Sequence, residues 1–479
     1  MKNWFCLALA VFMGLSLCAC GGSGESSAKE NAKENTKGLQ VGYAREKIMP
    51  NLSQKIPMGG YGNTDHRMAQ NVLDYLYITC IAMTEGDQTV LLFTQDLTHT
   101  YAFLVEQIRE KLTAQTGIPG ENILVASTHS HSTPSQDVTK QPGIQEYNQM
   151  YLEAAVKAAT DALADRASAT MYGGNVTVDN MNFVRHYLMN DGTYSGSNFG
   201  STKSGYKDHA TPNDPTMGLL KFERADDKED ILLMNWAAHA TLTGGMEKYD
   251  VSADYIGAAR TAFESATGMK FAFFLGAAGN QGTDSWMPEK ANNLDHNAYG
   301  QKLAQAAIDA LPGLTRLEGT GIQTAHTDIT YELNREDVDK LTQAQEVADL
   351  YKSTGDRATA GALAKQYGLT SVYHANSVVN RSKNPEGSTD TFRIHATRIG
   401  DFAFVNAPFE MFAASAVHIR ENSPFAETFV ITCSNDAHSY FPTKEAFEYG
   451  CYESYICRYA RGIAEDTAAE FVTLLESVK

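Results

Sequence analysis

The sequence predicts an α/β fold in which mixed β-sheets are layered with helices. Short apolar runs rich in β-branched and aromatic residues, which are typical of buried strands, alternate with stretches whose apolar residues recur every three or four positions, as in amphipathic helices. Neither a low-complexity break nor an internal repeat interrupts this alternation from residue 39 onward. We therefore expect one large domain over residues 39–479.

Six runs have the length and composition of buried strands, and polar residues or glycine bound each of them. They are residues 90–94, 123–127, 231–236, 271–275, 402–406 and 428–432. Four stretches have helical periodicity. They are residues 103–113, 151–164, 300–311 (ending before Pro312) and 336–352. The last of these carries many charges, so we expect it on the outside of the domain.

The N-terminus has the pattern of a secretory signal. A positive residue precedes an apolar run over 4–17. The last residue of this run is also the first of the sequence Leu-Cys-Ala-Cys at 17–20. These four residues resemble the lipobox of bacterial lipoproteins, which would place a lipid on Cys20 and anchor the exported protein to the cell envelope. We expect a signal peptide over 1–19, then a flexible linker to residue 38. An uncleaved anchor is the alternative, although such a run is short for a span of roughly 20 residues.

Charge and cysteine content exclude some functions. The net charge of −18 argues against nucleic acid and against electrostatic adhesion to anionic lipid. Three of the seven cysteines lie at or before position 20, and the others are Cys80, Cys433, Cys451 and Cys457. These four lack the spacing of a cysteine-ligated zinc site. A Cys451–Cys457 disulfide and free buried thiols are both compatible with the sequence.

Five of the strand-like runs lead directly into chemically capable residues. These residues are 128–132, His239, 276–282, 408–410, and the group of Asn435, His438 and Tyr440. In open α/β sheets, ligands bind at the carboxyl ends of strands, where side chains from different strands meet in one crevice. The sequence therefore predicts one site at these strand ends.

Each histidine in these segments also has an ordinary explanation. His129 and His131 are separated by one residue, so in an extended backbone both rings point to one face and could share an ion. Solvated loop histidines are nevertheless the commoner outcome for such a pair. His239 ends an apolar strand, where a buried histidine bonded to a backbone carbonyl is the default.

Glu410 and two tyrosines complete the candidate set. Glu410 could simply lie in the first turn of a helix over 411–419, where the helix dipole favours a carboxylate. Tyr440 and Tyr452 could be ordinary packing residues. Together, however, imidazole and carboxylate are the donors that zinc prefers in catalytic sites. The sequence lacks HExxH, GxSxG, P-loop and GxGxxG patterns, so a metal site assembled from distant segments is the best interpretation.

Several segments between residues 41 and 455 carry a resemblance to a known family. They are Val-Gly-Tyr-Ala-Arg (41–45), Pro-Met-Gly-Gly-Tyr-Gly (57–62), Thr-His-Ser-His-Ser (128–132), Asn-Trp-Ala-Ala-His-Ala-Thr (235–241), Val-Ser-Ala-Asp-Tyr-Ile-Gly (251–257), Ala-Pro-Phe-Glu (407–410) and the tyrosine-rich 435–453. Their residues and their order resemble the catalytic domain of the neutral/alkaline non-lysosomal ceramidase family. A chance His-x-His pair would not produce this order.

The resemblance implies a ceramidase-like zinc amidohydrolase. The implied Zn²⁺ ligands are His129, His239, Glu410 and Tyr440. His131 would take a proton from the zinc-activated water and pass it to the leaving amine, since an imidazole titrates near neutral pH. Tyr452 and Arg185 would stabilise charge on the carbonyl oxygen. The expected reaction is hydrolysis of an N-acyl amide, either ceramide-like or smaller.

Two departures from the family pattern limit what can be expected of the substrate. The family's Gly-Asp-x-Ser-Pro-Asn segment corresponds to Gly-Asn-Gln-Gly-Thr-Asp at 279–284, so Gly282 replaces a serine and excludes a serine nucleophile there. We also expect no C-terminal β-sandwich domain, and so no pocket shaped by one. An ester or acyl-carbohydrate hydrolase and a non-catalytic ligand-binding lipoprotein are the alternatives. Gly282 favours the latter, whereas retention of all four implied ligands argues against it.

Overall fold

The computed structural model describes residues 38–61, 67–137, 143–196 and 204–479. The expected signal peptide, the lipid-bearing Cys20 and nearly all of the expected linker lie outside these residues, so lipid anchoring stays a prediction. Lys37–Lys479 form one compact unit. Among the described helices, none combines the length and the apolarity that a membrane crossing requires.

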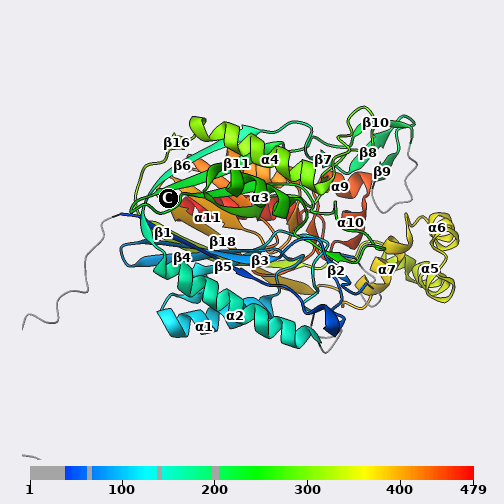
Figure 1. The fold of residues 1–479 in the computed structure, drawn as a ribbon. Coiled ribbons are helices and arrows are strands. Elements are labelled where there is room, and N and C mark those ends of the chain that lie inside the picture. The colour runs from blue at the N-terminus through cyan, green and yellow to red at the C-terminus, as the bar shows by residue number, and fades with distance from the viewer. Residues whose placement is uncertain (1–37, 62–66, 138–142, 197–203) are drawn as a thin grey trace, which may run out of the picture. The chain divides into compact units, whose positions relative to one another are not determined.

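A mixed sheet of nine strands forms one half of the core (Figure 1). Eight strands follow the order β14 (Lys270–Leu275), β12 (Ile231–Trp236), β11 (Thr216–Arg224), β6 (Ala167–Thr177), β1 (Gln40–Lys47), β3 (Tyr77–Glu85), β4 (Gln88–Gln95) and β5 (Ile123–Ser127), and β16 (Thr315–Arg316) pairs with β6. The β4–β5 and β12–β14 pairs are parallel and the others are antiparallel. The prediction of mixed sheets is therefore confirmed.

A second, four-stranded sheet packs against the first. Its order is β17 (Ile322–Glu332), β18 (Thr389–Ile399), β19 (Phe402–Asn406) and β21 (Glu427–Ile431), and β19 and β21 are parallel. Apolar side chains of both sheets form one buried cluster, in which Phe222 and Phe274 of the large sheet join Phe404 and Phe429 of the small one. The core is thus a sandwich of two sheets.

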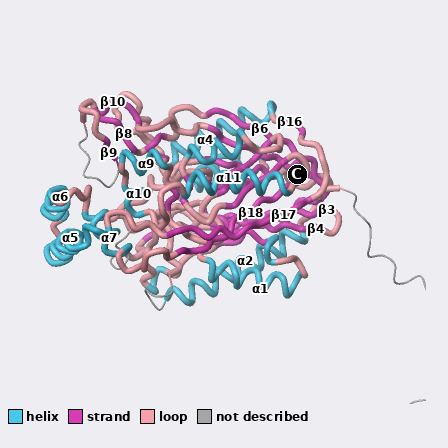
Figure 2. The backbone as a smooth tube through the Cα atoms, turned by 180° about the vertical axis from the view of Figure 1, so that it is seen from behind, coloured by secondary structure: helices cyan, strands magenta, loops and turns pink. Residues whose placement is uncertain are grey.

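Helices cover the outer faces of this sandwich. The covering helices are α1 (Ala102–Thr116) and α2 (Gly143–Ala164) on β3, β4 and β5, α3 (Asp254–Thr267) and α4 (His296–Ala310) on β12 and β14, and α8 (Ala413–Glu421) and α11 (Ile463–Ser477) on the small sheet. Figure 1 shows α1 and α2 side by side along one face, and Figure 2 shows α11 over β17 and β18.

Three further helices stand apart from the sheets. They are α5 (Leu341–Thr354), α6 (Arg357–Gln366) and α7 (Val372–Arg381), which share a small apolar core of their own. Both views place them beside α10 (Tyr452–Ile456), and α7 contacts α10 directly (Figures 1 and 2). We call residues 341–381 the three-helix insert.

All six predicted strands occur, and the bounds of β5, β12 and β19 match the prediction. The predicted helices over 103–113, 151–164 and 300–311 correspond to α1, α2 and α4. Helix α2 begins at Gly143, ahead of the predicted residue 151, and two other helices begin later than predicted. A 3-10 turn over Val338–Lys340 delays α5 until Leu341, and Glu410–Met411 form a short strand, β20, so that α8 begins only at Ala413.

The packing between the two sheets yields a first testable expectation. Phe404 is 1% exposed within the shared cluster, whereas Phe103 on α1 is 40% exposed. Phe404→Ala should lower the free energy of unfolding by about 3–5 kcal/mol, because it leaves a cavity between the sheets. Phe103→Ala should change it by less than about 1 kcal/mol. Urea unfolding of residues 38–479 measures both, and equal effects would contradict this view of the core.

Candidate metal centre

The two sheets join at the end where the predicted site residues lie. At the end of β5, the N–H of Ser127 donates to the carbonyl oxygen of Cys433 (3.0 Å). Just after β21, the N–H of Thr432 donates to the carbonyl oxygen of Leu275 at the end of β14 (2.9 Å). A cavity of about 310 Å³ lies at this junction and is lined by residues that follow β5, β19 and β21. The structure thus brings the predicted strand ends to one place.

His129 and His131 point into this cavity, but an extended backbone is not the reason. His129 has a left-handed backbone with φ of 63°, so the expected alternation of an extended strand does not apply. The resulting turn sets the two rings edge to face with centroids 4.8 Å apart, and their Nε2 atoms lie 3.2 Å from each other. The rings therefore converge through a strained turn.

Backbone carbonyls orient two of the imidazoles. Nδ1 of His129 lies 2.7 Å from the carbonyl oxygen of Thr98, and Nδ1 of His239 lies 2.7 Å from that of Ala278. Because a carbonyl can only accept a hydrogen bond, each Nδ1 carries the proton and each Nε2 keeps its lone pair. This arrangement is the usual one for imidazoles that bind a metal through Nε2.

Glu410 reaches the same point from the other sheet. Residues Glu410–Met411 (β20) pair in parallel with Tyr440–Phe441 (β22), which corrects the expectation that Glu410 opens a helix. Its Oε2 atom lies 3.2 Å from Nε2 of His129 and 3.2 Å from Nε2 of His239. One carboxylate oxygen therefore faces two imidazole nitrogens.

The unsatisfied atoms of this cluster fit a bound cation. The metal-binding atoms of His129, His131 and His239 all lie within 4.8 Å of one another. Nε2 of His239 and Oε2 of Glu410 are buried and have no hydrogen-bond partner among the described residues. Leaving such a group unpaired costs about 1–3 kcal/mol, and a divalent metal between the lone pairs would remove that cost. The residues present thus fit a metal ion.

Burial and mutual charge shift the pKa values of all four groups. Burial lowers the pKa of His129, but the Glu410 carboxylate and Cys433 together outweigh burial and raise that pKa well above its ordinary value. Burial raises the pKa of Glu410, but His129 and His239 together outweigh burial and lower that pKa well below its ordinary value. Burial and Arg185 lower the pKa of His239 to about 4. Burial and His129 lower the pKa of His131 well below its ordinary value, which corrects the expectation that His131 titrates near neutral pH.

The remaining predicted residues lie along one wall. Tyr440 and Tyr452 both line the cavity, with ring centroids 6.1 Å apart, and the Tyr440 ring stacks on His239 at 6.4 Å. The Arg185 guanidinium lies 5.6 Å from the centre of the Tyr440 ring but is not among the residues that line the cavity. Six of the seven predicted site residues thus face the cavity or its carboxylate, and Arg185 lies next to Tyr440.

Sequence reasoning missed the residue that holds Arg185. Glu453 is fully buried, and its Oε1 accepts from Nε of Arg185 (2.7 Å) while its Oε2 lies 2.8 Å from Nε2 of His186. Nη2 of Arg185 donates to the carbonyl oxygen of Gly279 (2.9 Å). Glu453 follows Tyr452 directly in the sequence, but only the folded chain shows its partners.

Two glycines allow the backbone to approach the site closely. A Cβ atom on Gly60, which has φ of 92°, would lie 2.6 Å from Cγ of His131. A Cβ atom on Gly279 would lie 2.7 Å from the carbonyl oxygen of Glu410 and 2.8 Å from that of Met411. Both glycines belong to motifs visible in the sequence, and the structure gives the steric reason for them.

Gly282, in place of the family serine, lies away from the cavity. It forms β15 with Gln281, and β15 pairs with β7 (Phe183–Val184). Gly282 is not among the residues that line the cavity, and a Cβ atom there would have no neighbour within 4 Å. The cluster of Glu410 and the histidines therefore forms without a contribution from the side chain at position 282.

The four cysteines within the described residues are free and buried, so Cys451 and Cys457 do not form a disulfide. Cys433 lines the cavity, and its Sγ lies 3.7 Å from Nδ1 of His129. The position of this thiol beside His129 could not be predicted from the sequence, because Cys433 belongs to no metal-binding spacing.

Comparisons with known proteins agree with this fold. The sequence model described as neutral/alkaline non-lysosomal ceramidase, N-terminal, matches residues 40–285. Two similar solved structures are the neutral ceramidase from Pseudomonas aeruginosa and a ceramidase complexed with C2. Each has a TM-score of 0.66 and 16% identity, and the matches cover 92% of this chain and 74% and 75% of those chains. No curated protein sequence matches the chain.

The close approach at Gly279 can be tested by adding a single methyl group. Gly279→Ala should lower the free energy of unfolding by about 1–3 kcal/mol, because its Cβ would overlap the carbonyls of Glu410 and Met411. Gly282→Ala, three positions along in the same segment, meets no atom and should change stability by less than about 0.5 kcal/mol. Thermal or urea unfolding measures both variants. Similar effects from the two would contradict the proposed contact.

Proposed function

Because the chain belongs to the neutral/alkaline non-lysosomal ceramidase family, we propose that it is a zinc-dependent hydrolase that cleaves the amide bond of an N-acyl substrate with metal-activated water. The observation that carries this proposal is the convergence of one Glu410 oxygen and two histidine Nε2 atoms in a buried cavity. Imidazole and carboxylate donors without cysteine suit a hydrolytic zinc better than a structural one, and zinc can expand from four to five ligands when water or substrate binds.

Imidazole and carboxylate donors without a cysteine ligand favour Zn²⁺. The proposed ligands are His129, His239, Glu410 and Tyr440. When bound, zinc polarises the scissile carbonyl and lowers the pKa of water toward about 7. Burial raises the pKa of the Tyr440 phenol, so the fourth ligand would lose its proton only beside a cation.

His131 is suited to move the proton. Burial keeps this imidazole neutral at pH 7, and its Nδ1 is buried without a hydrogen-bond partner among the described residues. A neutral imidazole within the cavity can take a proton from the attacking water and return it to the leaving amine. Its backbone is fixed by Arg67, whose Nη2 donates to the His131 carbonyl oxygen (2.7 Å).

Tyr452 is suited to donate a hydrogen bond to the substrate carbonyl. Burial raises the pKa of its phenol, so the hydroxyl keeps its proton at neutral pH. Arg185 would act from behind Tyr440, where its positive charge stabilises negative charge on the phenol and in the cavity. In this proposal Tyr452 contacts the substrate directly, whereas Arg185 acts on it only through its positive electrostatic potential.

The cavity size bears on the substrate. A volume of about 310 Å³ is near the lower end of the range for small-molecule pockets. A substrate would therefore place its amide and the adjoining groups inside, while a longer acyl chain would extend beyond the cavity. A ceramide-like lipid and a smaller N-acyl compound both meet this description.

Metal analysis combined with activity tests this proposal. Purified residues 38–479 should contain about one equivalent of zinc, and His129→Ala or His239→Ala should lose it. His131→Ala should keep the zinc and lose about 10²–10⁴-fold in turnover, because it removes the proton carrier but not the implied ligands. His418→Ala, an exposed histidine on α8, is the matched control and should change neither.

The substrate panel should include ceramides, acyl amino acids and acylated amino sugars, with the corresponding esters. Hydrolysis of amides that is lost with the zinc supports the proposal. A metal-free wild-type protein contradicts it. Zinc with ester hydrolysis alone would indicate the ester hydrolase alternative, and zinc without any turnover would indicate a ligand-binding protein.

Zinc affinity should also depend on pH. Glu410 raises the pKa of His129 above its ordinary value, so in the metal-free protein protonation of Nε2 competes with the metal more strongly as the pH is lowered. Affinity should therefore fall as pH is lowered, by up to about tenfold per pH unit for each proton displaced. Competition with a chelator between about pH 6 and about pH 8 measures the slope. A pH-independent affinity would contradict the assignment of His129 as a ligand.

A further inference from the structure

Helix α10 carries two side chains of the proposed site but is too short to hold itself in place. It spans five residues, Tyr452–Ile456. Tyr452 lines the cavity, and Glu453 binds Arg185. Because an isolated helix below about 12 residues is marginal in water, tertiary contacts must fix the position of α10. Helix α7 of the three-helix insert provides some of these contacts.

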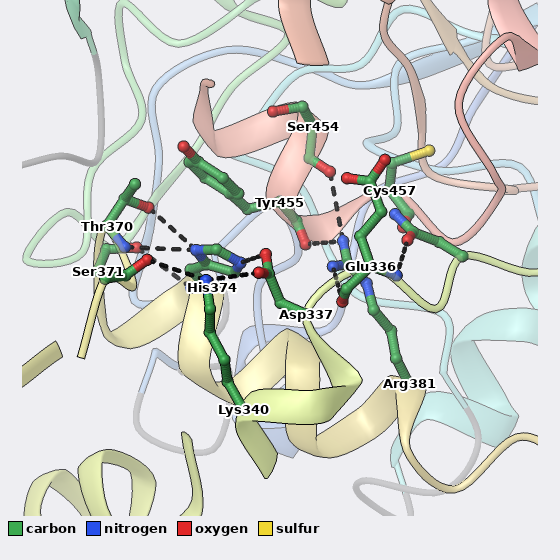
Figure 3. A network of polar contacts seen from close by, with 12 residues as sticks. Glu336, Asp337, Lys340, Thr370, Ser371, His374, Arg381, Ser454, Tyr455 and Cys457 are labelled. Atoms are coloured by element: carbon green, nitrogen blue, oxygen red, sulfur yellow. Dashed lines mark hydrogen bonds and ion pairs between the residues drawn. The ribbon is translucent and has the colours of Figure 1, made fainter. Parts of the chain in front are cut away.

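Arg381, the last residue of α7, binds the C-terminal end of α10 (Figure 3). Its Nη2 donates to the carbonyl oxygens of Ser454 (3.3 Å) and Tyr455 (2.5 Å). Carbonyls in the last turn of a helix have no intrahelical donor, and a planar guanidinium can serve two of them at once. Arg381 is itself buried and also donates from Nη1 to the carbonyl oxygen of Glu336 (3.2 Å).

The start of α7 contacts α10 through rings. Tyr373 meets Tyr452 edge to face with centroids 5.3 Å apart. His374 stacks on Tyr455 at 4.2 Å, and its Nε2 lies 3.0 Å from Oδ2 of Asp337. Figure 3 shows His374 and Arg381 reaching α10 from the same helix. Both ends of α7 therefore contact the helix that presents Tyr452.

From these contacts we infer that Arg381 is a positioning residue for Tyr452. By binding the carbonyls of Ser454 and Tyr455 it fixes α10, and so fixes the Tyr452 hydroxyl at the wall of the metal cavity. Arg381 does not line that cavity, so it acts through Tyr452 and not on the substrate. This inference rests on the proposed hydrolase function, since it assigns Tyr452 a role in turnover.

A double-mutant cycle separates positioning from a general loss of stability. Arg381→Met removes the guanidinium and its donors while keeping an unbranched, largely apolar side chain. It should lower kcat about tenfold when Tyr452 is present, and by less than about twofold in the Tyr452→Phe background, because the hydroxyl it positions is then absent. KM and zinc content should stay near the wild-type values. Arg381→Lys should restore part of kcat, since one ammonium can still reach one carbonyl.

Equal losses of kcat in the two backgrounds would overturn the inference, because Arg381 would then act independently of Tyr452. Loss of zinc from Arg381→Met would overturn it as well. Arg393→Met is the control. Arg393 is exposed on β18 and pairs with Asp328 (2.6 Å). Its removal should leave kcat unchanged.

Amide hydrogen exchange provides a measurement that does not require activity. In Arg381→Met the amides of residues 452–456 should exchange faster than in the wild type, whereas Arg393→Met should leave them unchanged. Unchanged exchange in Arg381→Met, or a rise spread over the whole chain, would overturn the inference. A wild-type protein that hydrolyses none of the panel substrates would instead overturn the proposed function, and the exchange result would still report whether Arg381 fixes α10.

Discussion

Oε2 of Glu410 faces Nε2 of His129 and Nε2 of His239 at 3.2 Å each, inside the protein. Removing a carboxylate from water costs several kcal/mol unless positive charge and hydrogen bonds compensate. The raised pKa of His129 and the lowered pKa of Glu410 express this mutual dependence. The carbonyls of Thr98 and Ala278 prevent either ring from turning away. Much of the surrounding structure holds the side chains of Glu410, His129 and His239 in these positions.

The backbone around the cavity is strained to bring them there. Four non-glycine residues in this region have left-handed φ values between 51° and 68°, namely His129, Cys433, Asn435 and Ser439. Such conformations persist only where the surroundings determine them, and they concentrate at functional sites. The Asn435 side chain accepts from the N–H of Val125 (2.9 Å), and the Asn435 N–H donates to the Val125 carbonyl oxygen (2.7 Å). The turn after β21 is thus fastened to β5 of the other sheet.

The sequence was informative where structure is local. Continuous apolar runs identify β5, β12 and β19 with their bounds, since a strand buried on both faces has no polar alternation. It was uninformative where structure depends on distant pairing. The two-residue strand of Glu410 exists only because Tyr440 lies beside it, and a two-residue strand has no periodicity to detect. The left-handed turn at His129 could not be predicted from the sequence either, because this backbone conformation is usual for glycine and not for histidine.

The histidine and tyrosine candidates could be named from motifs, but the residues that hold them could not. Glu453 and Arg381 are charged residues buried by partners far along the chain, and no spacing rule connects them to Arg185 or to α10. The low pKa of His131 is likewise a product of burial and of two neighbouring imidazoles. Charge states inside a protein follow from the folded surroundings, so they cannot be read from residue type.

Helix α10 links the two sides of the proposed chemistry. Tyr452 faces the cavity directly, while Glu453, the next residue, fixes the guanidinium that lies 5.6 Å from the Tyr440 ring. Breaking a buried ion pair such as Arg185–Glu453 typically costs about 3–5 kcal/mol, because the remaining charge is left without compensation. A displacement of α10 would therefore disturb both the Tyr452 phenol, which we propose contacts the substrate, and the charge behind Tyr440, the proposed metal ligand. A short helix with this double role requires rigid support from outside the site, and the buried fork of Arg381 supplies it.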